Sequence, residues 1–340
     1  MSVVKIKIES LYKIFGTNPK MGMEHVKNGV GKDELLTKYS HVLGLQDINL
    51  NIQEKSIQVI MGLSGSGKST LIRHINRLIE PTAGKITVED QDVMAYDKNA
   101  LRNFRRQKTA MVFQRFALMP HMTVIKNVSL GLDMQGVKPE ETKKKASIWI
   151  EKVGLSGYEE KYPQHLSGGM QQRVGLARAL TNDADILLMD EAFSALDPLI
   201  RKDMQDILLG LQSELHKTVV FITHDLDEAL KIGDRIAILK DGKMDQDDLP
   251  VDILLNPKTE YVRRFVEDVN RPRVLRAKHI MEKFNGADLS NAMSVDENDF
   301  IEKFLDKVIS EKPDMIVVQD KEKNNVGVLS AKRLSEILTK

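Results

Sequence analysis

Apolar and polar residues alternate at the start of the chain, and this pattern predicts a half-buried strand over residues 3–8. Two further strand-like segments follow at residues 45–52 and 57–61, and the second ends at a glycine-rich loop. A helical pattern then runs from residue 69 to residue 79, and residues 81–84 have the composition of a turn that closes it. The first part of the chain is therefore expected to place a strand, a loop and a helix in succession.

A polar stretch at residues 16–44 separates the first two strands. It contains Asn18-Pro19, and its pattern predicts a short helix over residues 33–43. Its lysine and glutamate residues, with scattered Leu, Val and Met, are typical of an exposed segment. We therefore expect an insertion on the domain surface.

Short apolar runs predict further strands at residues 86–88, 109–113, 186–189, 219–222 and 236–239. Helical patterns dominate between about 123 and 179, and strands alternate with helices after that. This alternation is the pattern of a parallel sheet covered by helices, so the fold class is α/β. The helical segment, at about 115–182, is expected to form a subdomain carried on the same core.

The character of the chain changes past residue 261. Residues 266–278 are charged and are expected to form a linker. Beyond them the pattern predicts a helix at 300–311, strands at 315–319 and 326–329, and a helix at 331–338. Residues 279–340 are therefore expected to form a small separate α/β module.

Composition narrows the classes of protein that the chain could represent. With 340 residues, about two domains are expected. Lys and Arg total 50 against 49 Asp and Glu, a net charge of +1, which argues against a strongly basic nucleic-acid binder. The absence of cysteine excludes disulfides, thiol nucleophiles and cysteine-bound zinc, and it suits a reducing cytoplasm. No apolar run approaches the ~20 residues that span a bilayer, so a membrane role would need a partner.

The strongest chemical signal lies between the strand at 57–61 and the helix that follows. It fits the phosphate-loop pattern G-x-x-x-x-G-K-[ST]. The residues are Gly62-Leu63-Ser64-Gly65-Ser66-Gly67-Lys68-Ser69, followed by Thr70. Glycine lets consecutive backbone N–H groups surround phosphates, the Lys68 ammonium can neutralise the β- and γ-phosphate oxygens, and the Ser69 hydroxyl can bind Mg²⁺. The sequence therefore predicts a nucleoside triphosphate site.

An acidic pair ends the apolar run at residues 186–189. Asp190 can hold Mg²⁺ through water, and Glu191 is placed to polarise a water for attack on the γ-phosphate. The alternative is a plain strand with a charged exit. A phosphate loop earlier in the same chain favours the catalytic interpretation.

A second anion-binding helix start is predicted in the sequence Leu166-Ser167-Gly168-Gly169-Met170-Gln171-Gln172-Arg173. Alone, its Ser-Gly-Gly would be no more than a loop and a helix cap. The phosphate loop already surrounds the β-phosphate. The simplest explanation for a second site, carried by Ser167, Gly168, Gly169 and Gln171, is that it serves the γ-phosphate of a nucleotide held by another subunit.

These three motifs together resemble the ATP-binding subunit of an ABC transporter, over about residues 1–265. The resemblance implies a P-loop NTPase core with an antiparallel β subdomain and a helical subdomain, a homodimer, and ATP with Mg²⁺ as cofactors. It also implies roles for single residues. Gln114 resembles the glutamine that touches Mg²⁺ and reports to the membrane subunits, Asp197 the D-loop aspartate, and His224 the switch histidine at the γ-phosphate. Phe15 lies where the family stacks an aromatic ring on adenine, with Tyr12 as a rival and a plain core aromatic as the alternative.

Several phrases are similar to one subgroup of that family. They include the insertion after the first strand, the segment Arg77–Thr82 and the segment Asp245–Pro250 followed by Asn256-Pro257. The subgroup comprises ATPases of importers for glycine betaine, proline betaine, carnitine or choline. It implies an integral membrane permease, an extracytoplasmic substrate-binding protein or domain, and a place on the cytoplasmic face of the cell membrane. The alternatives are an importer ATPase for another solute such as an amino acid, or a soluble ABC ATPase of DNA repair or translation. That last class would be expected to carry a second cassette, a long coiled coil or a basic face, and none is visible.

The C-terminal strands at 315–320 and 326–330 resemble the strand–turn–strand of a CBS motif. Such modules imply regulation by ionic strength or by a small nucleotide ligand. The remaining ~75 residues have room for one repeat only, whereas the usual unit is a tandem pair. The lone module is therefore expected to pair with a second subunit's copy or to be a remnant with a structural role, and a regulator built on it is a third class of function.

Overall fold

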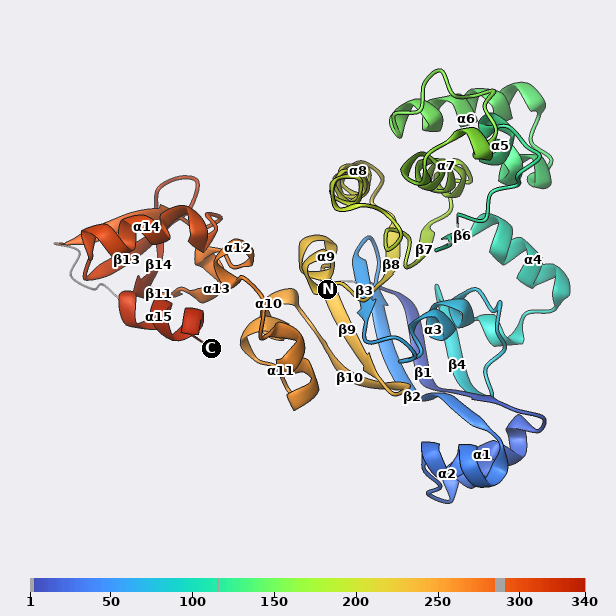
Figure 1. Ribbon diagram of the computed structural model, residues 1–340, viewed down its shortest axis with the longest axis horizontal. Helices are drawn as coiled ribbons and strands as arrows, with labels where there is room; N and C mark the ends of the chain where they lie inside the picture. The colour runs from blue at the N-terminus through green and yellow to red at the C-terminus, as the bar shows by residue number, and fades with distance from the viewer. Residues whose placement is uncertain (1–2, 115, 285–290, 340) are drawn as a thin grey trace. The chain divides into compact units, whose positions relative to one another are not determined.

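The computed structural model describes residues 3–114, 116–284 and 291–339 (Figure 1). The chain divides into two compact units, Met1–Asp247 and Asp248–Lys340. The first unit thus ends earlier than the boundary expected near residue 265. The segment expected to be a linker, 266–278, contains helix α12 (Arg271–Val274) and the start of α13 (Ala277–Ile280). Its Arg271 side chain is buried and donates to the Ile337 carbonyl at 2.8 Å, which explains why this charged stretch is folded into the second unit.

A six-stranded sheet forms the centre of the first unit. Its order is β10 (Lys243–Asp248), β9 (Arg235–Lys240), β3 (Ile57–Met61), β8 (Thr218–Thr223), β7 (Ile186–Asp190) and β6 (Thr109–Val112). The pairs β9–β3, β3–β8, β8–β7 and β7–β6 are parallel. Every residue of β3, β7 and β8 is buried, as expected for continuous apolar runs in a parallel sheet. The predicted α/β class is confirmed.

The parallel register sends four strand ends to the same edge of this sheet. Met61 pairs with Thr223, and Asp190 pairs with Ile222, so β3, β7 and β8 end level with one another. Val112 at the end of β6 pairs with Met189 on β7. The segments that follow these strands carry the predicted phosphate loop, the acidic pair, Gln114 and His224, and they all emerge at this edge.

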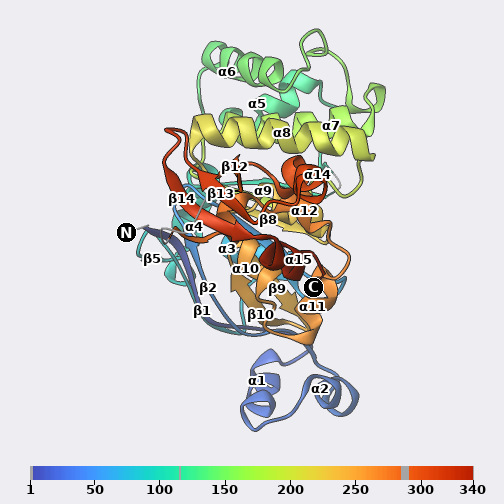
Figure 2. The same ribbon diagram turned by 90° about the vertical axis from the view of Figure 1, so that its left-hand side faces the viewer.

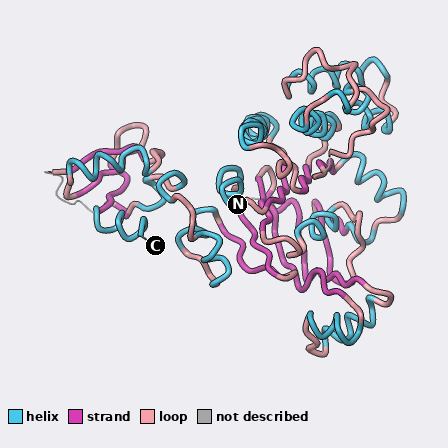
Figure 3. Tube along the Cα trace, in the orientation of Figure 1, coloured by secondary structure: helices cyan, strands magenta, loops and turns pink. Residues whose placement is uncertain are grey.

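A second, antiparallel sheet has the order β2 (Val42–Gln53), β1 (Val4–Phe15), β4 (Ala83–Val88) and β5 (Gln91–Asp92). Strands are drawn in magenta and helices in cyan in Figure 3. Helix α3 (Lys68–Ile75) lies in a shared apolar core with both sheets, which includes Ile6, Leu45, Leu71 and Ile222. The helix ends before residue 79, and the predicted turn at 81–84 runs into β4. Arg77, at φ +53°, breaks the helical backbone there.

The insertion contains two helices, α1 (Pro19–Lys27) and α2 (Lys32–Tyr39). The helix expected over 33–43 was wrong in its last four residues, 40–43. Ser40 adopts a left-handed conformation that ends α2, and β2 begins at Val42 because Leu43 and Leu45 both face apolar cores. Helix α1 was not predicted. It begins at Pro19, with the Asn18 side chain accepting from the Met21 N–H.

The helical subdomain comprises α5 (Val124–Gln135), α6 (Pro139–Lys152), the short 3₁₀ turn η2 (Pro163–His165) and α7 (Gly168–Thr181) (Figure 2). It has its own apolar core, in which Val128, Ile150 and Val174 are fully buried. The remaining elements of this unit are η1 (Val93–Ala95), α4 (Lys98–Gln107), α8 (Pro198–Leu215) and α9 (Leu226–Ile232). Within the described ranges, no helix combines the length and apolarity needed to cross a membrane.

The second unit contains a sheet of order β11 (Glu282–Lys283), β14 (Asn325–Ser330), β13 (Met315–Gln319) and β12 (Ala292–Asp296). Its other helices are α10 (Pro250–Leu255), α11 (Glu260–Val266), α14 (Ile301–Glu311) and α15 (Ala331–Thr339). The predicted helix–strand–strand–helix order after residue 300 is confirmed. The CBS character of the module stays a prediction.

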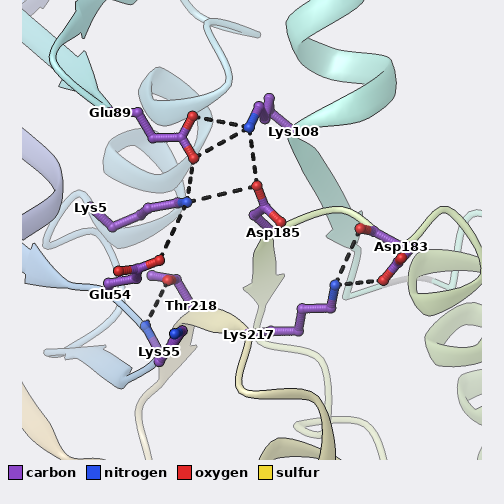
Figure 4. A network of polar contacts seen from close by, with 9 residues as sticks. All are labelled: Lys5, Glu54, Lys55, Glu89, Lys108, Asp183, Asp185, Lys217 and Thr218. Carbon is purple, nitrogen blue, oxygen red and sulfur yellow. Dashed lines mark hydrogen bonds and ion pairs between the residues drawn. The ribbon is translucent and has the colours of Figure 1, made fainter.

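A network of ion pairs joins the two sheets of the first unit at the amino ends of the parallel strands (Figure 4). Lys5 on β1 contacts Glu89, Glu54 at 3.9 Å and Asp185 at 3.7 Å. Lys108 contacts Glu89 at 3.0 Å and Asp185 at 3.1 Å. The hydrogen bond from Lys5 is the main reason that the pKa of Glu89 lies below its usual range. The pair of cations thus holds two carboxylates from different sheets together.

We predict that Lys5→Met lowers the free energy of unfolding by about 1–2 kcal/mol, because the Lys5 ammonium is largely buried and its partners half exposed. Urea unfolding measures the effect. Lys7→Met is the matched control, since Lys7 and Glu9 are both exposed, and it should change stability by less than about 0.5 kcal/mol. Carboxylates with lowered pKa values stabilise the fold at neutral pH and lose that effect as they are protonated. The Lys5→Met deficit should therefore shrink below about pH 4, and a deficit that is independent of pH would contradict the ionic explanation.

Candidate functional site

The predicted phosphate loop lies between β3 and α3, and its backbone requires glycine at two places. Gly62 has φ +148°, and a Cβ there would lie 2.2 Å from the Leu239 carbonyl oxygen. Gly67, at φ +101°, precedes α3, and its Cβ would lie 2.8 Å from Leu45 Cδ2. Ser64 and Gly65 are exposed at the loop tip. The loop is thus pressed against its own sheet while its outer side stays open.

Lys68 is buried at the start of α3, only 4% exposed. Its Nζ donates to the carbonyls of Gly62 at 2.8 Å and Leu63 at 3.1 Å. Burial lowers the pKa of Lys68, and the nearby Glu191 carboxylate partly offsets this. The buried Ser66 hydroxyl has no partner among the described residues. The loop therefore carries a buried ammonium and a buried hydroxyl for which the described residues provide no hydrogen-bond partner.

Asp190, at the end of β7, is almost fully buried, and its two oxygens have different partners. Oδ1 accepts from the Ser69 hydroxyl at 2.7 Å, and Oδ2 accepts from Arg73 Nη2 at 3.0 Å. Ser69 and Arg73 lie one turn apart on α3, so one face of this helix meets the carboxylate. The sequence analysis missed Arg73. Its i+4 spacing from Ser69 was the available signal.

Glu191 lies at the centre of the polar contacts of the site. Its Oε2 accepts from Gln114 Nε2 at 3.0 Å and lies 3.8 Å from His224 Nδ1, and its Oε1 lies 3.7 Å from Lys68 Nζ. Its backbone has φ +46°, a left-handed conformation that costs a non-glycine residue about 1–2 kcal/mol. The structure thus brings the four predicted catalytic residues together: Glu191, His224, Lys68 and Gln114.

The donors around Asp190 fit a magnesium ion. Ser69 and Asp190 supply a hydroxyl and a carboxylate, and the Gln114 amide, which donates to Glu191, carries a further oxygen. Mg²⁺ prefers oxygen ligands and needs few from the protein, since phosphates and waters complete its octahedron. Among the residues that the structure describes, no group of three or more His, Cys, Asp or Glu side chains could hold a metal by itself.

The Ser167 group lies on the helical subdomain. Ser167 caps α7 by accepting from the Met170 N–H, and the Gln171 amide donates to the carbonyls of Pro163 and Leu166. Ser167 and Gly168 are exposed. The polar contacts of the phosphate loop described above involve none of these residues. Within one chain, the structure therefore does not join this group to the phosphate loop.

Asp197 caps α8, accepting from the Ile200 N–H at 3.1 Å. The segment before it is tied to the acidic pair, because the Ser194 hydroxyl donates to the Glu191 carbonyl at 2.9 Å. This hydrogen bond thus links Ser194, in the predicted D-loop, to the main chain of Glu191.

Phe15 and Tyr12 differ in exposure. The Phe15 ring is 41% exposed and packs on Gly44, whose added Cβ would lie 2.7 Å from ring atom Cε2. The Gly44 carbonyl in turn lies 2.9 Å from the Cβ position of Gly67 in the phosphate loop. Tyr12 is half-buried, and burial raises its pKa. An aromatic surface beside the loop is therefore available at Phe15.

His74 lies in the last turn of α3 and is fully buried. Its Nδ1 contacts the Thr70 carbonyl at 2.6 Å, and its buried Nε2 has no partner among the described residues. Burial lowers the pKa of His74 to about 4. The helix that carries Lys68, Ser69 and Thr70 therefore contains a buried, neutral imidazole that contacts the Thr70 carbonyl.

A family model described as "ABC transporter" matches residues 45–194. The chain is 50% identical over 328 residues to the glycine betaine transport ATP-binding protein of Bacillus subtilis (strain 168), covering 96% of this chain and 77% of that protein. It is 46% identical to the trimethylamine N-oxide transport system ATP-binding protein of Pelagibacter ubique (strain HTCC1062), covering 95% and 94%. A dimeric post-hydrolysis structure of an ATP-binding cassette bound to ADP and Pi matches with a TM-score of 0.61 and 33% identity, covering 72% of this chain and 98% of that one.

We predict that acid weakens the fold through His74. In the unfolded chain an imidazole takes a proton near pH 6.5, whereas the buried one does so only near pH 4. The contribution is therefore intact above pH 6.5 and falls as the pH drops toward 4, by about 3 kcal/mol at most. His74→Asn keeps a donor for the Thr70 carbonyl and should flatten the pH dependence of the unfolding free energy over this interval. His121→Asn, at an exposed site, is the control. An unchanged slope in the His74 variant would contradict the prediction.

Proposed function

The chain belongs to the ABC transporter family, and from that premise we propose that it is the ATP-hydrolysing subunit of an importer for a small methylated amine. The observation that supports this most strongly is the convergence of Lys68, Gln114 and His224 on the Glu191 carboxylate. Hydrolysis needs a base beside the γ-phosphate, and Glu191 is the one carboxylate of the acidic pair that is not committed to Ser69 and Arg73.

The fold binds ATP or ADP, and we place the phosphates on the residues of the loop. Backbone N–H groups of the loop and the Ser66 hydroxyl would face the β-phosphate, and Lys68 would exchange its carbonyl partners for phosphate oxygens. Phe15 would stack on the adenine ring, since its exposed face lies beside the loop. Ser69, Asp190 and Gln114 would hold Mg²⁺, which neutralises charge on the β- and γ-phosphates when bound.

Glu191 would accept a hydrogen bond from the attacking water and draw off its proton as the bond to the γ-phosphorus forms. His224 would contact the γ-phosphate, and Gln114 would hold the other side of the carboxylate. The Lys68 ammonium, 3.7 Å from Glu191 Oε1, would help to orient that carboxylate before the nucleotide arrives. Cleavage releases phosphate and leaves ADP on the loop.

ABC cassettes dimerise and work with membrane permease subunits in importers. We propose that this chain forms a head-to-tail homodimer, in which Ser167, Gly168, Gly169, Gln171 and Asp197 of one chain face the nucleotide on the loop of the other. The start of α7 supports this, because Ser167 and Gly168 are exposed at a helix N-terminus, where backbone N–H groups can bind an anion. Two chains would thus close around two ATP molecules and open after hydrolysis.

The proposed site of action is the cytoplasmic face of the cell membrane, through an integral permease fed by an extracytoplasmic substrate-binding protein or domain. We propose a quaternary amine osmoprotectant as the solute: glycine betaine, proline betaine, carnitine or choline. Trimethylamine N-oxide is a second candidate, because the chain spans 94% of that relative's length but 77% of the glycine betaine relative's. Both classes share a small, fully methylated nitrogen. The C-terminal module would support the dimer or bind a small nucleotide.

We predict that Glu191→Gln keeps ATP affinity within about twofold but lowers hydrolysis at least about 100-fold, because an amide cannot take the proton of water. The variant should also accumulate as a dimer with ATP, detected by size-exclusion chromatography. Lys68→Ala is the companion change, and it should abolish ATP binding itself. Normal turnover in Glu191→Gln, or normal ATP affinity in Lys68→Ala, would contradict these roles.

The solute is tested with the complete complex in proteoliposomes, assembled with the permease and substrate-binding protein that accompany this chain in its genome. We predict ATP hydrolysis that rises at least about fivefold with glycine betaine, at lower concentration than with trimethylamine N-oxide. The reverse order would favour the second candidate. Stimulation by an amino acid alone would contradict the methylated-amine class, and stimulation by nucleic acid alone would contradict transport.

A further inference from the structure

The contacts around Glu191 close into a ring through Arg201 on α8. The Glu191 carbonyl accepts from Ser194 Oγ at 2.9 Å. Two residues after Ser194, the Leu196 carbonyl accepts from Arg201 Nη2 at 3.1 Å. Arg201 Nη1 then donates to Asp225 Oδ2 at 3.2 Å. Asp225 directly follows His224, whose Nδ1 lies 3.8 Å from Glu191 Oε2. Arg201 therefore links Leu196, in the D-loop that follows Glu191, to Asp225, which follows His224.

The two carboxylate oxygens of Asp225 have different partners. Its Oδ1 accepts from the Glu228 N–H at 3.1 Å and caps α9, while its own N–H donates to Thr223 Oγ1 at 3.0 Å. Its Oδ2 is left for the guanidinium. The cap fixes the backbone on the far side of His224, and the strand end Thr223 fixes the near side. A displacement of Asp225 would therefore move the short segment that carries the His224 imidazole.

One turn further along, a second contact joins the same two helices. Gln205 Nε2 donates to Glu228 Oε1 at 3.1 Å, and both side chains are buried. Burial raises the pKa of Glu228. Because this buried contact already docks α8 on α9, helix packing alone does not need the Arg201 contacts at the loop end.

A third contact provides an internal comparison. Lys231 on α9 and Asp206 on α8 form an ion pair of 2.7 Å with side-chain exposures of 32% and 57%. Arg201 and Asp225 are similar, at 28% and 33%. The two ion pairs join the same helices, but only Arg201 also holds the D-loop carbonyl and only Asp225 adjoins His224.

We propose that Arg201 is a positioning residue for ATP hydrolysis, which holds the Leu196 carbonyl of the D-loop and the segment after His224 as one unit around Glu191. The inference rests on the proposed function. Arg201 touches no reacting atom in it. A guanidinium suits the task because its planar fork presents separate donors to a carbonyl and a carboxylate at once. The D-loop faces the partner's nucleotide in the proposed dimer, so Arg201 also connects that nucleotide's surroundings to the base of its own chain.

The experiment compares Arg201→Met with Lys231→Met in the full-length protein. Steady-state hydrolysis gives kcat, titration with a fluorescent ATP analogue gives Kd, and thermal unfolding gives Tm. We expect Arg201→Met to lower kcat at least tenfold with Kd within twofold of wild type. Lys231→Met should change both by less than twofold, with a similar loss in Tm. Arg201→Lys should fall between, because one ammonium cannot match both acceptors in the fork geometry.

Equal kcat values in Arg201→Met and Lys231→Met, or a drop in kcat that follows Tm in both variants, would overturn the proposal. Asp225→Asn provides a second route, since asparagine still caps a helix but removes the charge. It should lower kcat at least threefold, and in the double variant with Arg201→Met the losses should not add, because the two residues act as a pair. Full additivity would also overturn the proposal.

The result separates this inference from the proposed function. A wild-type protein that binds the ATP analogue but does not hydrolyse ATP would overturn the function, and Arg201 with it. A wild-type protein that hydrolyses ATP normally, with an Arg201→Met variant as active as wild type, would overturn the role of Arg201 alone.

Discussion

The parallel pairing of β3, β6, β7 and β8 is the constraint from which the site follows. Because Met61 pairs with Thr223 and Asp190 with Ile222, residues more than 100 positions apart leave the sheet at one level. Each strand is followed by one group of the site. A shift of one residue in the pairing of neighbouring strands would move these groups away from Glu191. The ion pairs of Lys5 and Lys108 lie at the opposite ends of the same strands, where they fix the antiparallel sheet against this register.

Charge balance inside the site explains how it can exist before a nucleotide arrives. Lys68 and Asp190 are both buried, and Glu191 is nearly so. Buried charges are tolerated only when partnered, and here Arg73 meets Asp190 while Lys68 meets Glu191 and two carbonyls. A triphosphate entering the loop adds negative charge beside Lys68, and Mg²⁺ would offset it beside Asp190. Without a ligand, the charges of Lys68 and Arg73 balance those of Asp190 and Glu191, which allows the two carboxylates to stay beside the loop.

The sequence was sufficient to predict features that depend on residues close together in the chain. The glycine-rich loop after β3 and the buried strands depend on residues within a few positions of each other, and the structure has them as expected. The expected helix over 33–43 failed because the apolar Leu43 and Leu45 belong to a strand whose partner, β1, is far away in the chain. Arg73 and Arg201 were not predicted, for the same reason. Each contacts a residue on another element: Arg73 contacts Asp190, and Arg201 contacts Asp225. The boundary after Asp247 depends on tertiary contacts within residues 248–340, which periodicity alone does not show.

Gly169 connects the two surfaces that a partner chain would meet. A Cβ at this position would lie 2.6 Å from Ile200 Cγ2, so only glycine allows the start of α7 to approach the first turn of α8 so closely. Ser167 caps α7, and Asp197 caps α8. The exposed helix start and the D-loop are therefore packed as one surface, although they belong to the helical subdomain and the sheet core respectively. A rotation of the helical subdomain must either carry α8 with it or break this contact. In the first case the motion reaches Arg201, whose guanidinium lies one turn beyond Asp197, and through it the segment that positions His224 against Glu191.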